Sequence, residues 1–286
     1  MEQIFFKLLR ILPDKVYLQM LFFKHFHRLI NFKNPKTFNE KIQWLKIYNR
    51  KSEYTTLVDK HLVKEYVASK IGKEYVIPTL GVWNHASEID FNELPNQFVL
   101  KWNHDSGSVL ICKDKSKLNY EDARSTIDGY ENHNAYWYGR EWPYKNVKPC
   151  IIAEPYLVDS STNDLPDYKF FCFNGKVKLL FIASNRQKKD EETYFDYFDE
   201  NFNHLDLSNG HPHAPKCPSK PKSFDLMVTL AESLSKGIPH VRVDFYEVDC
   251  KVYFGEMTFY NRSGLTPFQP RLWDETLGSW LKLNKA

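Results

Sequence analysis

The residues best suited to chemistry in this 286-residue chain are Arg242, Asp244 and Glu256. They fall in two runs of alternating apolar and polar residues, 241–246 and 251–258, which predict a β-hairpin turning at 247–250. Because strand side chains alternate, Arg242 and Asp244 should share one face, with Glu256 opposite Asp244 in an antiparallel pair. Two carboxylates so close repel each other unless a cation lies between them.

The cation expected between these carboxylates is Mg²⁺. Hard oxygen ligands on rigid strands suit this ion, which takes one or two protein carboxylates and fills its shell with nucleotide phosphates. The hairpin is therefore a candidate site for a metal-bound nucleotide. The alternative is a surface hairpin whose charged side chains face solvent.

A candidate phosphate-binding lysine, Lys101, lies in the middle of a short apolar run, 98–102, that predicts a strand. A lysine beside a loop of small residues with accessible N–H groups can hold nucleotide phosphates. The pattern also fits an edge strand with a solubilising lysine. The loop that follows, 103–108, contains Ser106, Gly107 and Ser108.

Two further charged residues occupy positions where they could meet a ligand. Lys60 follows Asp59 in the first turn of a helix predicted over 59–71, and Glu154 ends the apolar part of a strand predicted over 150–158. An exposed ion pair at Lys60 and a solvated acid at Glu154 are the alternatives.

The fold class expected from the pattern of elements is α+β. Residues 1–57 predict helices, with a break near Pro13, and the helix predicted over 223–236 ends at Gly237. An Asn174-Gly175 pair between two apolar runs predicts a tight hairpin turn. No internal repeat or low-complexity segment occurs.

Charge is distributed unevenly along the chain. Residues 1–51 hold eleven Lys or Arg against three Asp or Glu, a net of +8 in a chain whose total is +3. A basic first segment indicates an anionic surface or substrate near it, and with its Phe, Leu and Ile residues it could lie on a membrane surface. The alternative is an ordinary helical region that packs on the rest of the chain. No nucleic-acid partner is expected.

The five cysteines are widely spaced and include no C-x-x-C pair. Their spacing therefore indicates neither a zinc site nor a disulfide framework. A reducing cytoplasm is the expected compartment, and the basic first segment could add peripheral contact with the inner face of the membrane.

Taken in chain order, these pieces resemble the ATP-grasp superfamily, which includes the D-alanine–D-alanine ligases. The resemblance is carried by Asp59-Lys60, Val99-Leu100-Lys101, Ile152-Ala153-Glu154 and Arg242-Val243-Asp244 before Glu256. It implies that Asp244 and Glu256 hold magnesium and that Arg242 stabilises the transferred phosphoryl group. The residues that it assigns to ATP are Lys60, Lys101, Ser106, Gly107, Ser108 and Lys169, with Glu154, Tyr156 and Leu157 at the adenine and Asp167 at the ribose.

A closer similarity, over nearly the whole chain, is to the TupA-like ATP-grasp family of bacterial surface-polysaccharide clusters. It implies an ATP-grasp fold in which two α+β subdomains clasp ATP, after a helical N-terminal region at 1–57. The ATP-grasp domain would cover 58–286, with a nucleotide-binding lid at roughly 90–153 and a metal-binding part at roughly 154–286. The segments that carry this similarity are Asn34-Pro35-Lys36-Thr37-Phe38-Asn39-Glu40-Lys41, Phe98-Val99-Leu100-Lys101, Asp167-Tyr168-Lys169-Phe170-Phe171 and Phe254-Gly255-Glu256-Met257-Thr258-Phe259-Tyr260.

Two positions depart from the superfamily pattern. Many ATP-grasp ligases end the metal motif with Glu-x-Asn, whereas this chain has Glu256-Met257-Thr258. Thr258 is therefore the third expected metal ligand. The sequence is compatible with one or two metal ions. Asn261-Arg262 replaces a common Pro-Gly. Arg262 could bind a carboxylate through two hydrogen bonds, or be solvated.

The resemblance implies an ATP-dependent carboxylate–amine ligase that forms an amide through an acyl phosphate. Its substrates would be an amino acid and a uronic acid or amino sugar, free or lipid-linked, in capsule or O-antigen biosynthesis. ATP with Mg²⁺, or Mn²⁺ as an alternative, would be required, and Arg242 and Arg262 would be catalytic. The alternatives are a glycosyltransferase that uses a nucleotide sugar, although no Asp-x-Asp motif occurs, and a non-catalytic scaffold.

Overall fold

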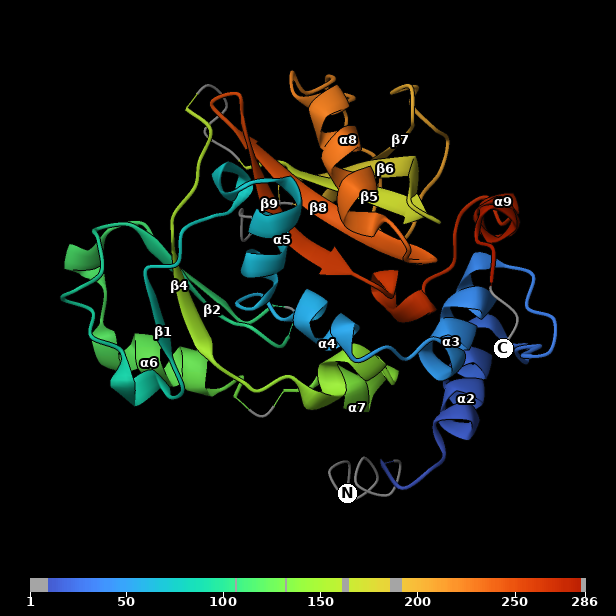
Figure 1. Cartoon of the computed structure of the whole chain (residues 1–286), viewed down its shortest axis with the longest axis horizontal. Coiled ribbons are helices and arrows are strands. Elements are labelled where there is room, and N and C mark those ends of the chain that lie inside the picture. The colour runs from blue at the N-terminus through green and yellow to red at the C-terminus, as the bar shows by residue number, and fades with distance from the viewer. Residues whose placement is uncertain (1–9, 106, 132, 161–164, 186–191, 284–286) are drawn as a thin grey trace.

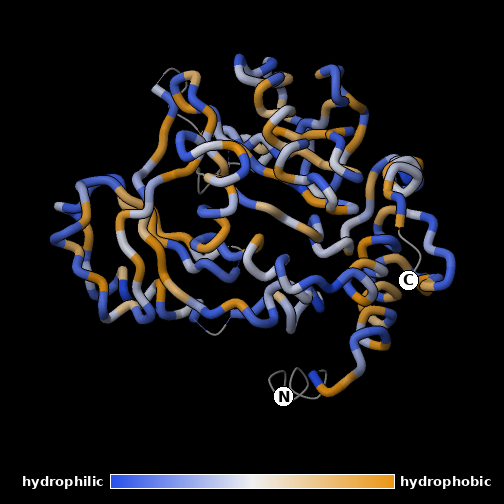
Figure 2. Tube along the Cα trace, in the orientation of Figure 1, coloured by the Kyte–Doolittle hydropathy of each residue, from blue (hydrophilic) through white to orange (hydrophobic). Residues whose placement is uncertain are grey.

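The computed structural model describes residues 10–105, 107–131, 133–160, 165–185 and 192–283. Two antiparallel sheets lie on either side of a central region, and a group of helices from both ends of the chain packs at one side (Figure 1). The α+β class expected from the sequence is confirmed. Figure 2 shows apolar residues along the strands of both sheets and along the helices that pack on them.

The smaller sheet has the strand order β1-β4-β2-β3. Its strands are β1 (Gly81–Trp83), β2 (Phe98–Trp102), β3 (Val109–Cys112) and β4 (Ile151–Pro155). Alternate residues of β2 are fully buried against helix α6 (Tyr120–Asp128), and the indole of Trp102 donates to the carbonyl of Ile127 at 2.8 Å. The other side chains of β2, those of Val99 and Lys101, therefore point to the opposite face.

The larger sheet has the order β7-β6-β5-β8-β9, with every neighbouring pair antiparallel. Helix α8 (Phe224–Ser235) covers one face, where Phe224 packs on Phe170. The strands of this sheet are β5 (Asp167–Phe173), β6 (Lys176–Ser184), β7 (Tyr194–Asp199), β8 (His240–Val248) and β9 (Lys251–Thr258). The face opposite α8 carries the charged residues considered below.

Both hairpins predicted in this sheet are present. Asn174 and Gly175 have φ of 51° and 80°, as a tight turn between β5 and β6 requires. The turn between β8 and β9 is shorter than the predicted segment 247–250. Only Asp249 and Cys250 leave the ladder, because pairing continues through Val248 and Lys251.

Helix α3 belongs to the main core, whereas the buried residues of α2 form a separate apolar cluster with Ile30 and Phe32. Helix α2 begins directly after Pro13, as predicted, and α3 begins with a capping box formed by Thr37 and Glu40. Phe38, on α3, packs against aromatic rings of β5 and β8. The helices not yet located are α2 (Asp14–Phe26), α3 (Phe38–Tyr48), α4 (Glu53–Val58), α5 (Val63–Ile71), α7 (Ala135–Gly139) and α9 (Leu272–Trp280).

Within the described ranges, no helix is both long enough and apolar enough to cross a membrane. The apolar residues of the basic first segment lie in three places. Phe5, Phe6, Leu8 and Leu9 lie outside the described residues, Ile11 lies before α2, and Leu21, Phe22 and Phe23 belong to α2.

His240, the first residue of β8, is a buried histidine next to the charged face. Its side chain lies among Phe38, Phe171 and Phe173, and Nδ1 lies 3.0 Å from the carbonyl oxygen of Cys172. Burial lowers the pKa of His240 from 6.5 to about 3. The folded chain therefore resists protonation of this ring over several pH units.

We expect this histidine to make the protein sensitive to acid. Between pH 6.5 and 3 the unfolded chain binds a proton at His240 that the folded chain does not, so stability falls as pH falls through this window. The loss at pH 5 should be about 2 kcal/mol, from the difference between the two pKa values. In urea unfolding at pH 7 and pH 5, His240→Gln should lose about 2 kcal/mol less than wild type between these pH values. The exposed-histidine control His85→Gln should follow wild type, and parallel losses in all three proteins would contradict the assignment.

Candidate active site

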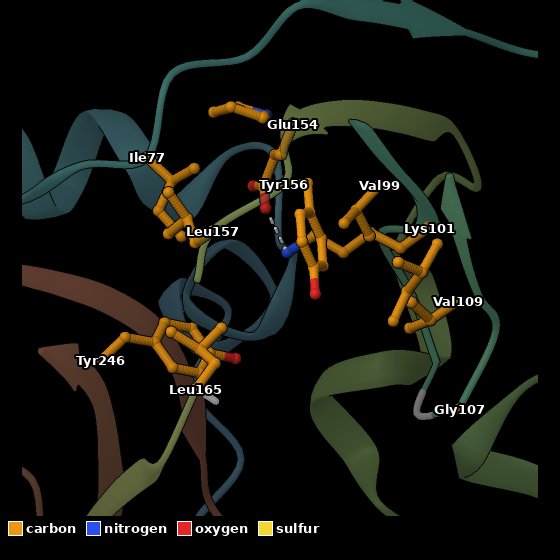
Figure 3. A pocket seen from close by; sticks show the side chains of 12 residues that line it. Ile77, Val99, Lys101, Gly107, Val109, Glu154, Tyr156, Leu157, Leu165 and Tyr246 are labelled. Carbon is orange, nitrogen blue, oxygen red and sulfur yellow. Dashed lines mark ion pairs between the residues drawn. The ribbon is translucent and has the colours of Figure 1, made fainter. Parts of the chain in front are cut away.

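A cavity of about 320 Å³ lies between the two sheets, with walls from both (Figure 3). Lys101 and Glu154 come from the smaller sheet, and Tyr246 comes from β8 of the larger one. An apolar slot with a few charged groups can hold a planar base and orient the polar part of the same ligand. The aliphatic side chains of its wall are Ile77, Val99, Val109, Ile111, Leu157 and Leu165.

Glu154 is held between two lysines on the wall of this cavity. Its carboxylate lies 2.6 Å from Lys101 Nζ and 2.7 Å from Lys64 Nζ. Burial acts to raise the pKa of Glu154, but the charges of Lys101 and Lys64 outweigh it and lower the pKa. Glu154 is therefore an ionised anchor for both lysines, and Tyr156 and Leu157 follow it along the cavity.

Lys64 was not among the residues selected from the sequence. It lies on α5 and also donates to Thr79 Oγ1 at 2.7 Å and to the carbonyl of Ile77 at 3.0 Å. Its contact with Glu154 joins helix α5 to strand β4, a pairing that sequence spacing does not reveal.

Lys60 lies before helix α5, not in its first turn. The helix begins at Val63, and Asp59 turns the chain into it by accepting from the backbone N–H groups of His61 and Leu62. Lys60 Nζ donates to the carbonyl oxygens of Trp102 and Asp105, so it reaches the loop after β2. Burial lowers the pKa of Lys60, against the charges of Glu256, Asp105 and Glu154.

Buried hydrogen bonds of Asn103 hold the start of the loop 103–108 in place. Asn103 donates to Asp59 Oδ2 at 2.9 Å and accepts from the backbone N–H of Cys150 at 2.8 Å. Gly107 has φ of 101° and lines the cavity, with open space where a side chain would begin. The buried Ser108 donates its hydroxyl to Asp105. Ser106 lies outside the described residues.

The second group of charges lies on β8 and β9, in the register expected from the sequence. Asp244 pairs with Glu256, and Arg242 pairs with Thr258. The guanidinium of Arg242 lies 2.7 Å from each oxygen of Asp244 through Nε and Nη2, and Nη2 lies 2.8 Å from Glu256 Oε1. Thr258 Oγ1 is 3.0 Å from the same Nη2 and donates to Glu256 at 2.9 Å.

Lys169 completes this group from the neighbouring strand β5. Its amine pairs with Asp167 Oδ2 at 2.7 Å and with Asp244 Oδ2. Asp167, the expected ribose ligand, is buried beside this lysine. The buried carboxylate of Asp244 therefore meets two cations, as a buried charge requires.

Glu256 is the carboxylate of this group that reaches open space. Its side chain is 36% exposed, and it lines a second cavity. Burial acts to raise the pKa of Glu256, but Lys169, Arg242 and Lys60 outweigh it and hold the pKa well below its usual range. With Asp244 and Thr258 it offers a set of hard oxygen atoms, and this donor chemistry fits Mg²⁺.

The second cavity, of about 300 Å³, adjoins the charged face. Along β8, residues 242, 244 and 246 share one face, with Tyr246 at the first cavity and Arg242 at the second. Four residues of rise near 3.3 Å separate these ends by about 13 Å. The other charged or aromatic residues that line the second cavity are Asp105, Glu141, Tyr144, Lys169, Phe181, Phe195, Glu256, Tyr260 and Arg262.

Arg262, expected to be catalytic, lies in a strained turn at the mouth of this cavity. Arg262, Ser263 and Gly264 have φ of 47°, 55° and 60°, a left-handed run that is rare for residues with side chains. Two side chains of α3 stabilise this turn. Lys46 Nζ donates to the carbonyl and the hydroxyl of Ser263 at 2.8 Å. Gln43 donates to the carbonyls of Ser263 and Gly264 at 2.9 Å.

Glu141 lines this cavity and, like Lys64, was not among the residues selected from the sequence. Burial raises the pKa of Glu141, against the charge of Lys46 and a hydrogen bond from Ser263. A carboxyl group with a raised pKa that lines a cavity is a candidate to accept or donate a proton. No local pattern around Glu141 marks this role.

Several solved structures are similar to this chain at low identity. The D-alanine–D-alanine ligase from Bacillus anthracis is 15% identical, covers 71% of this chain and 57% of its own length, and has a TM-score of 0.43. The corresponding ligase from Helicobacter pylori is 15% identical, with coverage of 86% and 69% and a TM-score of 0.44. A D-cycloserine synthetase is 16% identical, with coverage of 79% and 71% and a TM-score of 0.42.

The chain thus spans little more than half the length of the B. anthracis ligase. A comparison with curated proteins finds no match. The family assignment comes from a sequence model, TupA-like ATPgrasp, which matches residues 40–282 and so takes in both sheets, both cavities and the charged face of β8 and β9. The chain therefore belongs to the TupA-like ATPgrasp family and has the ATP-grasp fold of that family.

Proposed function

We propose that the protein is an ATP-dependent ligase that joins a carboxylate to an amine through an acyl phosphate. The observation that carries the proposal is the face of β8, where Tyr246, Asp244 and Arg242 run from one cavity to the other. A nucleotide in the first cavity would direct its phosphates along this face toward a substrate in the second. Family membership supports the same reaction class.

The first cavity would hold the adenine and the phosphates nearest to it. Tyr156, Leu157 and the aliphatic walls suit a planar base. Lys101 and Lys60 would meet the phosphates, and Gly107 leaves its loop room for a close approach. Glu154 would keep Lys101 extended toward them through the 2.6 Å ion pair.

The charged face would exchange partners when the nucleotide binds. Mg²⁺, when bound at Asp244 and Glu256 with Thr258 beside them, would neutralise charge on the phosphoryl group being transferred. Lys169 and Arg242 now balance these carboxylates, so both cations would be available to the phosphates. Their positions are fixed in advance by β5 and β8, which lowers the reorganisation needed during transfer.

The second cavity would hold the carboxylate and the amine. Arg262 and Arg242 offer guanidinium groups to a carboxylate, and Glu141 offers a base to an ammonium group. Tyr144, Phe181 and other aromatic side chains of the wall suit the apolar face of a sugar ring. We therefore propose an amino acid and a uronic acid or amino sugar as substrates, in the synthesis of a bacterial surface polysaccharide such as capsule or O-antigen.

Release of ADP tests this reaction class. The protein with ATP, Mg²⁺ and pairs drawn from amino acids, uronic acids and amino sugars should release ADP and phosphate fastest with one carboxylate–amine pair. Release of AMP would contradict an acyl-phosphate ligase. Release of ADP at a rate that does not depend on the amine, with every carboxylate that supports turnover, would also contradict it. Consumption of a nucleotide sugar without ATP would instead support the glycosyltransferase alternative.

Lys101 should contribute strongly to ATP affinity. A hydrogen bond to a charged group is worth about 1.5–3 kcal/mol, so Lys101→Met should weaken the Mg·ATP complex by roughly 10- to 100-fold in calorimetry. Lys117→Met is the matched control, because this lysine is 83% exposed on the same part of the chain. Unchanged affinity in a folded Lys101→Met protein would remove Lys101 from the phosphate site.

We also propose peripheral contact with an anionic membrane, where lipid-linked acceptors are found. Ile11, Met20 and Phe23 are 78%, 51% and 52% exposed, while Leu18 and Phe22 of the same region are buried. The structure of α2 is thus compatible with one packed face and one free apolar face. The basic residues of this segment would add roughly 1 kcal/mol each near an anionic surface.

Co-sedimentation with phosphatidylserine-containing vesicles distinguishes the two roles of α2. We expect binding at low salt that weakens at high salt, and weaker binding by an Ile11→Ser, Phe23→Ser variant. Absence of binding at low salt would leave α2 as a purely structural helix.

A further inference from the structure

A second group of metal-ligand residues lies on the larger sheet, on the face of β7 opposite its cavity-lining residue Phe195. Asp196 is fully buried, and its Oδ1 lies 3.3 Å from His204 Nε2 and 3.3 Å from His213 Nδ1. The three candidate ligand atoms all lie within 4.8 Å of one another. Neither histidine is part of the nucleotide site or of the second cavity described above.

The two distances from the carboxylate oxygen to the imidazole nitrogens match the edges of a metal tetrahedron. Ligand atoms bound at about 2.0–2.1 Å around a tetrahedral zinc ion are about 3.3–3.4 Å apart. A direct imidazole–carboxylate hydrogen bond is usually shorter, at about 2.9–3.0 Å. His213 Nδ1 is buried and makes no hydrogen bond of good geometry with any described group.

The charge of Asp196 points the same way. A buried carboxylate needs a compensating charge. Within the described residues its ion pairs are both with histidines, which carry charge only when protonated. A divalent ion would supply this charge. The other oxygen, Oδ2, accepts from the backbone N–H of Ala214 at 3.2 Å, which fixes the orientation of the carboxylate as second-shell contacts do at metal sites.

We infer that Asp196, His204 and His213 form a binding site for Zn²⁺, with the fourth position open. Two imidazole nitrogens and one carboxylate oxygen are a common ligand set for this ion. His204 and His213 lie 8 and 17 residues after Asp196, a spacing that no C-x-x-C motif marks.

The ion would fasten the loop between the two histidines to strand β7. That loop packs against the segment that carries Arg262: Asn209 donates to the carbonyls of Thr266 and Pro267 at 3.0 Å. Gly210, with φ of 83°, lies so close to Arg262 that a β-carbon would come within 2.8 Å of its guanidinium. A bound ion would therefore order one wall beside Arg262 whichever reaction the protein catalyses.

Zinc binding to the whole, metal-stripped chain tests the inference. After incubation with Zn²⁺ and dialysis, wild type should retain one Zn²⁺ per chain. In titrations against a chromophoric chelator, the affinity of wild type for Zn²⁺ should be at least tenfold higher than that of His204→Ala or His213→Ala. Co²⁺ in place of Zn²⁺ should give the intense visible bands of a tetrahedral site in wild type only.

Two control variants separate this site from other sources of binding. His85→Ala removes an exposed histidine on the other side of the molecule, and Glu256→Gln removes a carboxylate of the nucleotide site; both should retain Zn²⁺ as wild type does. Zn²⁺ should also raise the melting temperature of wild type and leave that of His204→Ala unchanged. Failure of wild type to retain Zn²⁺, or equal retention by both histidine variants, would overturn the inference. Loss of Zn²⁺ from Glu256→Gln alone would assign the ion to the nucleotide site and also overturn it.

Discussion

The guanidinium of Arg242 lies between two carboxylates, and the arrangement of the whole site depends on this contact. Burial acts to lower the pKa of Arg242, but Asp244 and Glu256 outweigh it and raise the pKa, so the group remains charged. Removing a buried cation from such a network leaves uncompensated carboxylates, which is far more costly than losing an exposed ion pair. The network is therefore fixed in place by the strands, while its carboxylates and cations remain able to exchange partners with a metal and phosphates.

Helix α3, near the N-terminus, supports this site through its contacts with the larger sheet and with the turn at 262–264. Phe38 anchors α3 against the larger sheet, and Lys46 and Gln43 on the same helix hold the left-handed turn at 262–264. The backbone of this turn is strained, and strain of this kind persists only where surrounding contacts hold it. Gly264 fits because a β-carbon there would lie 2.6 Å from Ile42. Helix α3 is thus part of the framework that presents Arg262.

The parts of the site that could be predicted from the sequence are those encoded by local periodicity. Strand alternation placed Arg242 and Asp244 on one face and Glu256 opposite, and the register of β8 and β9 confirms it. The predicted turn at 247–250 is too long. Glu247 and Val248 continue strand β8 because they pair with Val252 and Lys251 of β9. The start of α5 was placed too early, since Asp59 caps the turn before the helix instead of beginning it.

What the sequence did not reveal depends on contacts between distant elements. Lys64 acquires its importance from Glu154, which lies 90 residues later on another element. Glu141 matters because the chain brings it next to Ser263 and Lys46, and the Asp196 cluster exists because a loop folds back on β7. In each case the residue types are ordinary, and only the three-dimensional arrangement gives them a partner.

The central claim is that Asp244 and Glu256 exchange their protein cations for a metal when a nucleotide binds. Crystals grown with ADP and Mn²⁺, measured at a wavelength where Mn²⁺ scatters anomalously, test it most directly. The account predicts an anomalous peak within about 2.0–2.3 Å of both carboxylates, with Lys169 turned from Asp244 toward the phosphates. Density for ADP in the first cavity without a Mn²⁺ peak at these carboxylates would contradict it.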